Sequence, residues 1–98
     1  MDITDTNSDC SIYIGGKPLM NYVTAVVMQF TTKNASKVII KSRGKFISMA
    51  VDVVEIVRNR FLKDQIKLGE ISINSEGCTN KEGKQVRVST MEISLIKK

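Results

Sequence analysis

Two short segments combine glycine with basic side chains in a way that suits the binding of an anion. The first is Gly15-Gly16-Lys17-Pro18, and the second runs from Lys41 through Arg43 to Lys45. Glycine lets backbone N–H groups turn toward a ligand, and lysine and arginine supply the charge that a phosphate requires. Neither segment has the G-x-x-x-x-G-K-[ST] spacing of a P-loop, so a nucleotide-hydrolysing enzyme is not expected.

The sequence has few residues of the types that form catalytic sites. Histidine is absent, which removes His-based acid–base catalysis, Ser-His-Asp and Cys-His nucleophiles, and most zinc sites. The two cysteines, Cys10 and Cys78, lie far apart and are expected to be free thiols, although the sequence alone is also compatible with a bridge. The acidic residues form no cluster typical of a metal site. We therefore expect neither an enzyme nor a cofactor.

The charge of the chain favours a polyanionic partner. The 98 residues carry 15 Lys and Arg against 10 Asp and Glu, a net charge of +5. Three of the acidic residues and none of the basic ones fall within the first ten positions. A basic body of this kind suits nucleic acid or an anionic surface, and equally a well-solvated ordinary domain. Aromatic residues make up only 5%, so contact with the sugar–phosphate backbone fits better than base stacking.

Hydrophobic periodicity predicts the elements that must position these loops. Residues 1–10 are polar and acidic and predict a disordered tail, whereas residues 11–98 predict a single domain. We expect the order β-α-β-α-β-β, with strands at 11–14 and 37–42, helices at 19–32 and 45–61, and two long strands after residue 65. No segment is apolar and long enough to span a membrane and no signal peptide is evident, which predicts a cytoplasmic protein.

Local signals refine these elements. Pro18 favours a helix after it despite several β-branched residues, and Asn34 suits its end. The second helix has a polar stripe at 48, 52, 55 and 59 and a wide apolar arc, which we expect the first helix, or in part a partner, to cover. In the last two strands, alternation slips at Gly69-Glu70 and again between Val88 and Met91, which predicts two bulges. Residues 80–83 predict the tip of a projecting hairpin.

The strand–helix–strand unit makes the first two strands parallel, so both basic loops leave the same edge of the sheet. Each loop leads into a helix N-terminus, where free N–H groups and the helix dipole favour an anion. We therefore expect Lys17, Arg43 and Lys45 to form a phosphate-binding site, joined by a basic hairpin arm. The basic residues of that arm are Lys81, Lys84 and Arg87.

Four long segments resemble the Alba (Sac10b) family of archaeal chromatin proteins, and the likeness covers nearly everything from residue 11 onward. They are 14–23, 40–45, 50–61 and 87–93. The resemblance implies an α/β fold, a two-layer α+β sandwich like the C-terminal domain of bacterial translation initiation factor three, with a projecting β-hairpin. It also implies a homodimer, or a heterodimer with a paralogous chain, that binds double-stranded DNA and RNA largely independently of sequence. Such a protein coats and compacts DNA in the nucleoid. An RNA-binding subunit of an RNase P-like assembly is the alternative.

The resemblance implies roles for particular residues. Family members hold the duplex with the two basic loops and reach along the minor groove with the hairpin. The matching positions here are Lys17, Lys41, Arg43, Lys45, Lys81, Lys84 and Arg87. Phe61, which by itself reads as a core aromatic closing the second helix, matches a phenylalanine that packs dimer against dimer along DNA. The family loop often carries two lysines whose reversible acetylation weakens DNA binding. Gly16 takes the first position here, which leaves Lys17 for an acetyltransferase and a deacetylase.

Overall fold

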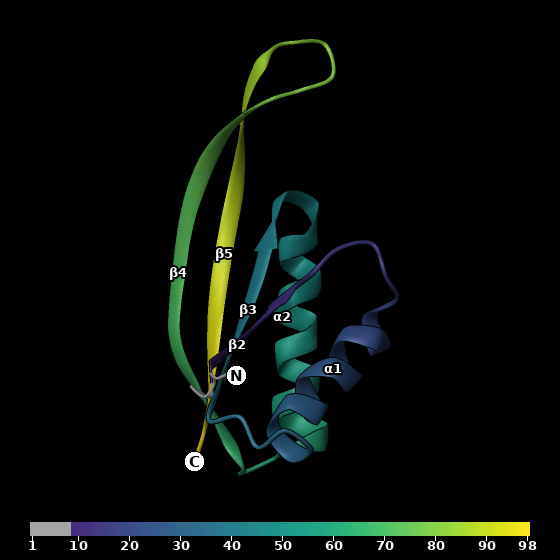
Figure 1. The fold of residues 1–98 in the computed structure, drawn as a ribbon, viewed down its shortest axis with the longest axis vertical. Helices are drawn as coiled ribbons and strands as arrows, with labels where there is room; N and C mark the ends of the chain where they lie inside the picture. The colour runs from purple at the N-terminus through teal and green to yellow at the C-terminus, as the bar shows by residue number, and fades with distance from the viewer. Residues whose placement is uncertain (1–8) are drawn as a thin grey trace, which may run out of the picture.

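The computed structural model describes residues 9–98, which form a four-stranded sheet with two α-helices against one of its faces (Figure 1). The strand order is β2-β3-β5-β4. The β2 strand runs parallel to β3, and the other two pairs are antiparallel. The expected β-α-β-α-β-β order and two-layer α/β architecture are therefore confirmed. The elements are β2 (Asp9–Tyr13), α1 (Leu19–Thr31), β3 (Lys37–Arg43), α2 (Ile47–Ile56), β4 (Ile66–Thr79) and β5 (Gln85–Lys97).

The first strand begins two residues earlier than expected and ends one residue earlier. It pairs with β3 in parallel from Asp9 opposite Lys37 to Tyr13 opposite Lys41. Backbone pairing with β3 holds this edge strand although its first residue is charged, and hydrophobic periodicity does not detect such pairing. Residues 1–8 of the expected tail lie outside the described residues. Cys10 in this strand and Cys78 in β4 are free thiols, as expected.

The segment after Pro18 is a helix, which confirms the choice of helix over strand. Its buried residues are Tyr22, Val23, Val26 and Phe30, which share one helical face. Asn34 adopts a left-handed conformation with φ of 55° beyond the helix end. The next N–H, that of Ala35, donates to the Gln29 carbonyl at 2.8 Å, so the turn at Asn34 closes the helix.

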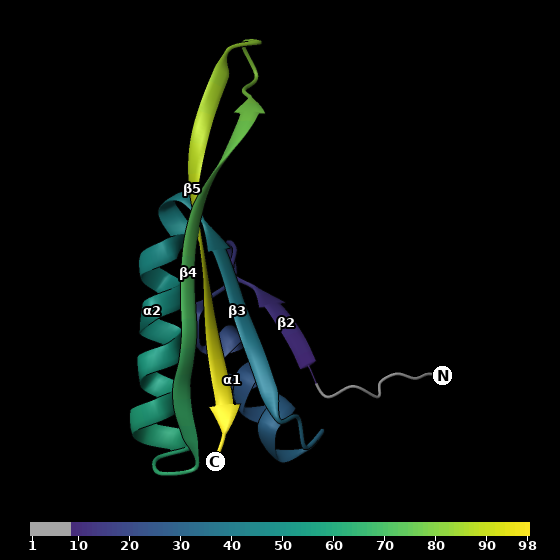
Figure 2. The same ribbon diagram turned by 90° about the vertical axis from the view of Figure 1, so that its left-hand side faces the viewer.

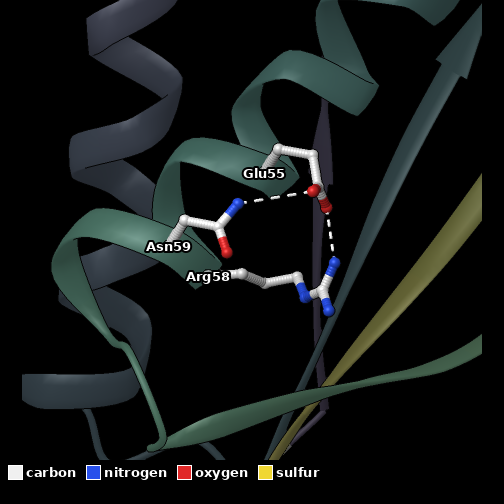
Figure 3. Close-up of polar contacts among 3 residues, drawn as sticks. All are labelled: Glu55, Arg58 and Asn59. Carbon is white, nitrogen blue, oxygen red and sulfur yellow. Dashed lines mark hydrogen bonds and ion pairs between the residues drawn. The ribbon is translucent and has the colours of Figure 1, made fainter.

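The second helical segment, expected at 45–61, runs through three parts. A short 3₁₀ turn, η1 (Gly44–Phe46), precedes α2, and a π-helical turn, η2 (Val57–Phe61), follows it. The expected polar stripe is exposed. Within it the Glu55 carboxylate accepts hydrogen bonds from Arg58 at 2.6 Å and Asn59 at 3.4 Å (Figure 3). These contacts join α2 to the start of η2.

The last two strands form an arm that projects beyond the helices (Figure 1). The bulge predicted at Gly69-Glu70 is confirmed, because the pairing shifts between Leu68 and Ile71. The second predicted bulge is wrong, since β5 pairs without interruption from Gln85 to Ile93. Valines 86 and 88 lie on the face opposite to Met91, where the arm has no helix to bury them, so the pattern changes without a change in backbone register.

The core lies between the sheet and the helices. Its most deeply buried side chains are Ile40, Leu95, Val23, Val26, Val38, Val53 and Val57. Figure 2 looks onto the opposite face of the sheet, which no helix of residues 9–98 covers. Alternation along the strands places Tyr13, Lys41, Arg43 and Glu92 on this open face, because their neighbours in sequence point to the core. No helix within the described residues is long and apolar enough to cross a membrane.

Candidate nucleic-acid interface

The loop that carries Lys17 is held by a single buried phenol. The Tyr22 hydroxyl on α1 accepts hydrogen bonds from the backbone N–H groups of Gly15 at 2.9 Å and Lys17 at 3.1 Å. These two donors are therefore already used and are not free for an anion, contrary to the expectation for this loop. The Lys17 side chain is exposed and forms no ion pair within residues 9–98. Tyr22 thus sets the path of the loop, and the ammonium group remains for a ligand.

The second basic loop leaves β3 through Gly44. This glycine has a φ of 56°, a left-handed conformation that glycine adopts at little cost. The chain then enters η1, where the Lys45 Nζ lies 5.4 Å from the centre of the Phe46 ring. No side chain caps the start of α1 or of η1. The first N–H groups of these helical segments remain open to water or an anion.

The two loops leave the same edge of the sheet, as the parallel pairing requires. The backbone N–H of Ile14, just after β2, donates to the Lys41 carbonyl at 2.9 Å. The Lys17 loop therefore starts beside the last residues of β3, from which Arg43 and Lys45 follow. The two helix-start loops thus leave the same edge of the sheet, as predicted, while Lys17 and Arg43 line separate grooves.

Two of the predicted residues already have acidic partners. The Lys41 Nζ lies 3.9 Å from a carboxylate oxygen of Glu92, and an Arg43 guanidinium nitrogen lies 3.6 Å from Glu76. The sequence analysis missed both carboxylates. Glu92 lies directly opposite Lys41 because β5 is next to β3, and Glu76 comes from β4, on the far side of β5 from Arg43. Sequence separation gives no signal for such pairs.

The hairpin arm presents the remaining basic residues away from the loops. Its tip is closed by Asn80, whose Oδ1 accepts hydrogen bonds from the N–H groups of Glu82 and Lys84, both at 2.9 Å. The side chains of Lys81 and Lys84 are exposed beside this turn. Further down the arm, Arg87 donates to the Ser75 hydroxyl at 2.8 Å across the two strands. The arm therefore carries its positive charge along its length and at its end.

Phe61 does not belong to the core. Its side chain is 48% exposed at the end of η2, whereas the next residue, Leu62, is buried. The π-turn, in which the Leu62 N–H donates to the Val57 carbonyl, places these two neighbours on different sides of the helix end. The interpretation of Phe61 as a core aromatic is therefore wrong, and a surface role remains.

A second exposed apolar surface runs along one side of α2 and onto β4. The α2 helix packs against β3 and β5, so the helix-facing side of β4 keeps its apolar residues in solvent. Ile71 and Ile73 are 48% and 75% exposed there. Val51 is 42% exposed on α2, on the same face of the helix as Glu55. We call the exposed residues Val51, Leu68, Ile71 and Ile73 the α2–β4 patch.

The Alba family model matches residues 11–75. A DNA/RNA-binding protein Alba from Methanococcus maripaludis is 47% identical over 89 residues, covering 91% of this chain and 99% of the relative. One from Nanoarchaeum equitans is 54% identical over 88 residues, covering 89% and 97%.

Two solved structures of Alba proteins are similar to this chain in fold. Alba from Thermoplasma volcanium superposes with a TM-score of 0.81 at 50% identity, covering 88% of this chain and 98% of the other. ALBA1 from Trypanosoma brucei has a TM-score of 0.69 at 18% identity, covering 89% of this chain and 68% of the other. The second likeness concerns the fold alone.

Proposed function

This chain belongs to the Alba family, and from that membership we propose that it binds double-stranded DNA and RNA as a dimer and coats and compacts DNA. The observation that carries the proposal is the position of two basic loops at one edge of the sheet, continued by a basic arm. The curated relatives at 47% and 54% identity are named for binding both nucleic acids, which supports the same activity here. Association with the nucleoid follows if DNA is the main partner.

Binding is directed at phosphates and tolerates any base sequence. Four lysines of the proposed surface are exposed and form no ion pair in the described part of the chain; they are Lys17, Lys45, Lys81 and Lys84. A lysine ammonium is a point charge that meets phosphate oxygens and does not distinguish bases. Binding at such positions releases counterions and is therefore sensitive to salt. Arg43 and Arg87 complete the surface between the loops and the arm.

Dimerisation occurs through the α2–β4 patch. Large isoleucine and leucine side chains are exposed on the edge strand β4, and exposed apolar residues grouped in this way mark an interaction site. A second copy related by a two-fold axis would cover the patch with the same residues and double the number of basic loops on the DNA. A paralogous chain with the same patch would form a heterodimer. Exposed Phe61 then supplies the contact between neighbouring dimers.

Lys17 is the candidate for regulation by acetylation. Its side chain is exposed and its ammonium group has no ion-pair partner within residues 9–98, so an acetyltransferase could reach it. Acetylation removes the charge and with it the phosphate contact. The neighbouring residue, Gly16, has no side chain that could be acetylated. Loss of a single charge per protomer is therefore the whole effect.

Binding isotherms for two unrelated duplexes and one structured RNA test the proposal. The account predicts equal affinities for the two duplexes at each salt concentration and measurable binding to the RNA. Duplex affinities that differ by several kcal/mol would contradict sequence-independent binding. Competition between duplex and RNA separates the chromatin role from that of a subunit of an RNase P-like assembly, because strong preference for the RNA would favour the second.

A further inference from the structure

A groove of about 410 Å³ lies on the open face of the sheet, beside the proposed phosphate-binding loops. The strand register brings Tyr13, Lys41 and Glu92 into one row across β2, β3 and β5. Arg43 and Glu76 border the same groove from β3 and β4. A volume of this size is typical of sites for small organic groups.

The charges of the groove do not suit a phosphate alone. Lys41 is paired with Glu92, and Arg43 with Glu76, so two cations face two carboxylates. The separations of 3.9 and 3.6 Å exceed hydrogen-bond length, so both carboxylates keep their capacity to accept hydrogen bonds. Carboxylates repel phosphate and attract N–H groups. The groove therefore favours a ligand part that is uncharged and carries N–H donors, with phosphates nearby.

The groove also has an aromatic wall at the edge of the sheet. Tyr13 is 69% exposed on β2, and the Lys41 Nζ lies over one face of its ring, 5.4 Å from the centre. The Tyr13 hydroxyl forms no hydrogen bond within residues 9–98. An exposed tyrosine on a sheet surface is the arrangement on which nucleobases stack, and the long Lys41 side chain has to move aside from the ring face to admit a base. Phe46 borders the groove from the other side.

We propose that this groove binds an unpaired guanine of single-stranded RNA, stacked on Tyr13, with the Glu92 carboxylate accepting the guanine N–H groups. The N1–H and N2–H groups of guanine lie side by side and match the two oxygens of one carboxylate, whereas adenine and cytosine offer a single amino group. In a duplex the pairing cytosine occupies this edge, so the site recognises only unpaired guanine. The inference rests on the proposed function and adds a base-selective site to it.

The test compares three oligonucleotides by fluorescence anisotropy: oligouridine RNA, the same RNA with one central guanine, and a DNA duplex of equal phosphate number. The wild-type protein should bind the guanine-containing RNA more tightly than oligouridine. Tyr13→Leu should lose at least about fivefold on the guanine-containing RNA, the lower limit for one stacked base, and keep the wild-type affinity for the duplex. Tyr13→Phe retains the ring and is the matched control, so it should bind like the wild type.

Glu92→Gln provides a second variant with a different signature. The amide no longer supplies two acceptor oxygens, so the preference for the guanine-containing RNA should disappear. Because a negative charge beside Lys41 is also lost, the affinity for oligouridine should not fall. A plain electrostatic role for Glu92 would instead raise the affinity for both RNAs equally.

Three results would overturn the inference. Tyr13→Leu could leave RNA binding unchanged, or weaken duplex and RNA alike, or the wild type could bind duplex while ignoring the central guanine. In each case the proposed DNA binding stands and the groove loses its assignment. Failure of the wild type to bind any of the three oligonucleotides would instead contradict the proposed function itself. A single-stranded DNA with one guanine distinguishes the two sources of unpaired base, and binding tighter than that of the RNA would contradict the assignment to RNA.

Discussion

Replacing Tyr22 by phenylalanine removes one oxygen atom from the buried phenol that holds the Lys17 loop. The ring stays in the core, where Tyr22 is 8% exposed, so packing is preserved. The N–H groups of Gly15 and Lys17 lose their common acceptor. Each hydrogen bond of this kind contributes about 0.5–1.5 kcal/mol net, so the free energy of unfolding should fall by about 1–3 kcal/mol. Both N–H groups are only partly buried, so water can replace the lost phenol oxygen. We therefore expect the loss of unfolding free energy to lie at the lower end of this range.

Urea unfolding followed by circular dichroism, at one fixed protein concentration, measures this loss. For a domain of this size the melting temperature should fall by at least about 4 °C. Tyr13→Phe is the matched control, because the Tyr13 hydroxyl forms no hydrogen bond in the part of the chain that the structure describes. The reasoning is refuted if Tyr22→Phe unfolds at the wild-type urea concentration, or if Tyr13→Phe loses as much stability.

Three further predictions concern the surface and the sheet. Phe61→Ala should cost less than the roughly 3–5 kcal/mol of a core phenylalanine and abolish cooperative coating of long DNA in gel-shift titrations; retained cooperativity would contradict the contact. Ile73→Glu should give a folded monomer by light scattering, because a charge would be buried in the α2–β4 patch, and a dimer of unchanged affinity would refute that interface. Gly69→Ala should lower the free energy of unfolding in urea by less than about 1 kcal/mol, because the Ile96 Cδ1 that the new Cβ would meet at 2.6 Å is the far end of a side chain that can move. Gly77→Ala on the same strand meets nothing closer than 4.0 Å and should be neutral, and a larger loss for Gly69→Ala would contradict the expected movement of Ile96.

Much of the fold could be predicted because its signals are local. Pro18 and the length of the segment that follows it predict the helix α1, and the right-handed crossover predicts parallel pairing of β2 with β3. The bulge at Gly69 follows from a break in alternation on β4 and corresponds to the shift in pairing between Leu68 and Ile71. A similar break on β5 was misleading, since Val88 and Met91 lie on opposite faces of a regular strand. Neither break lies where its strand has buried residues, and alternation specifies register strongly only where one face is buried.

The contacts within the site could not be predicted from the sequence, because they depend on the order of the strands in the sheet. Lys41 and Glu92 are 51 positions apart and become neighbours only when β5 lies beside β3. Nothing in the spacing of Tyr22 shows that its hydroxyl accepts hydrogen bonds from the loop before it. The place of Phe61 at a helix end by itself suggests a core aromatic, and the π-turn of η2 turns the side chain outward. Polar contacts between strands, and the direction of side chains at helix ends, become evident only from the tertiary structure.

The salt dependence of duplex binding tests the central claim most directly. If a dimer neutralises roughly 6–10 phosphates, affinity should fall by about 10³–10⁵ between about 50 and 200 mM salt. Lys17→Gln should lower the logarithmic slope by about 1 per protomer, because one phosphate contact is lost. Lys63→Gln makes the same charge change in the segment between η2 and β4, at the opposite end of the sheet from the loops (Figure 1), and should keep the wild-type slope. An affinity that does not change with salt, or identical slopes for Lys17→Gln and the wild type, would contradict phosphate binding by these loops.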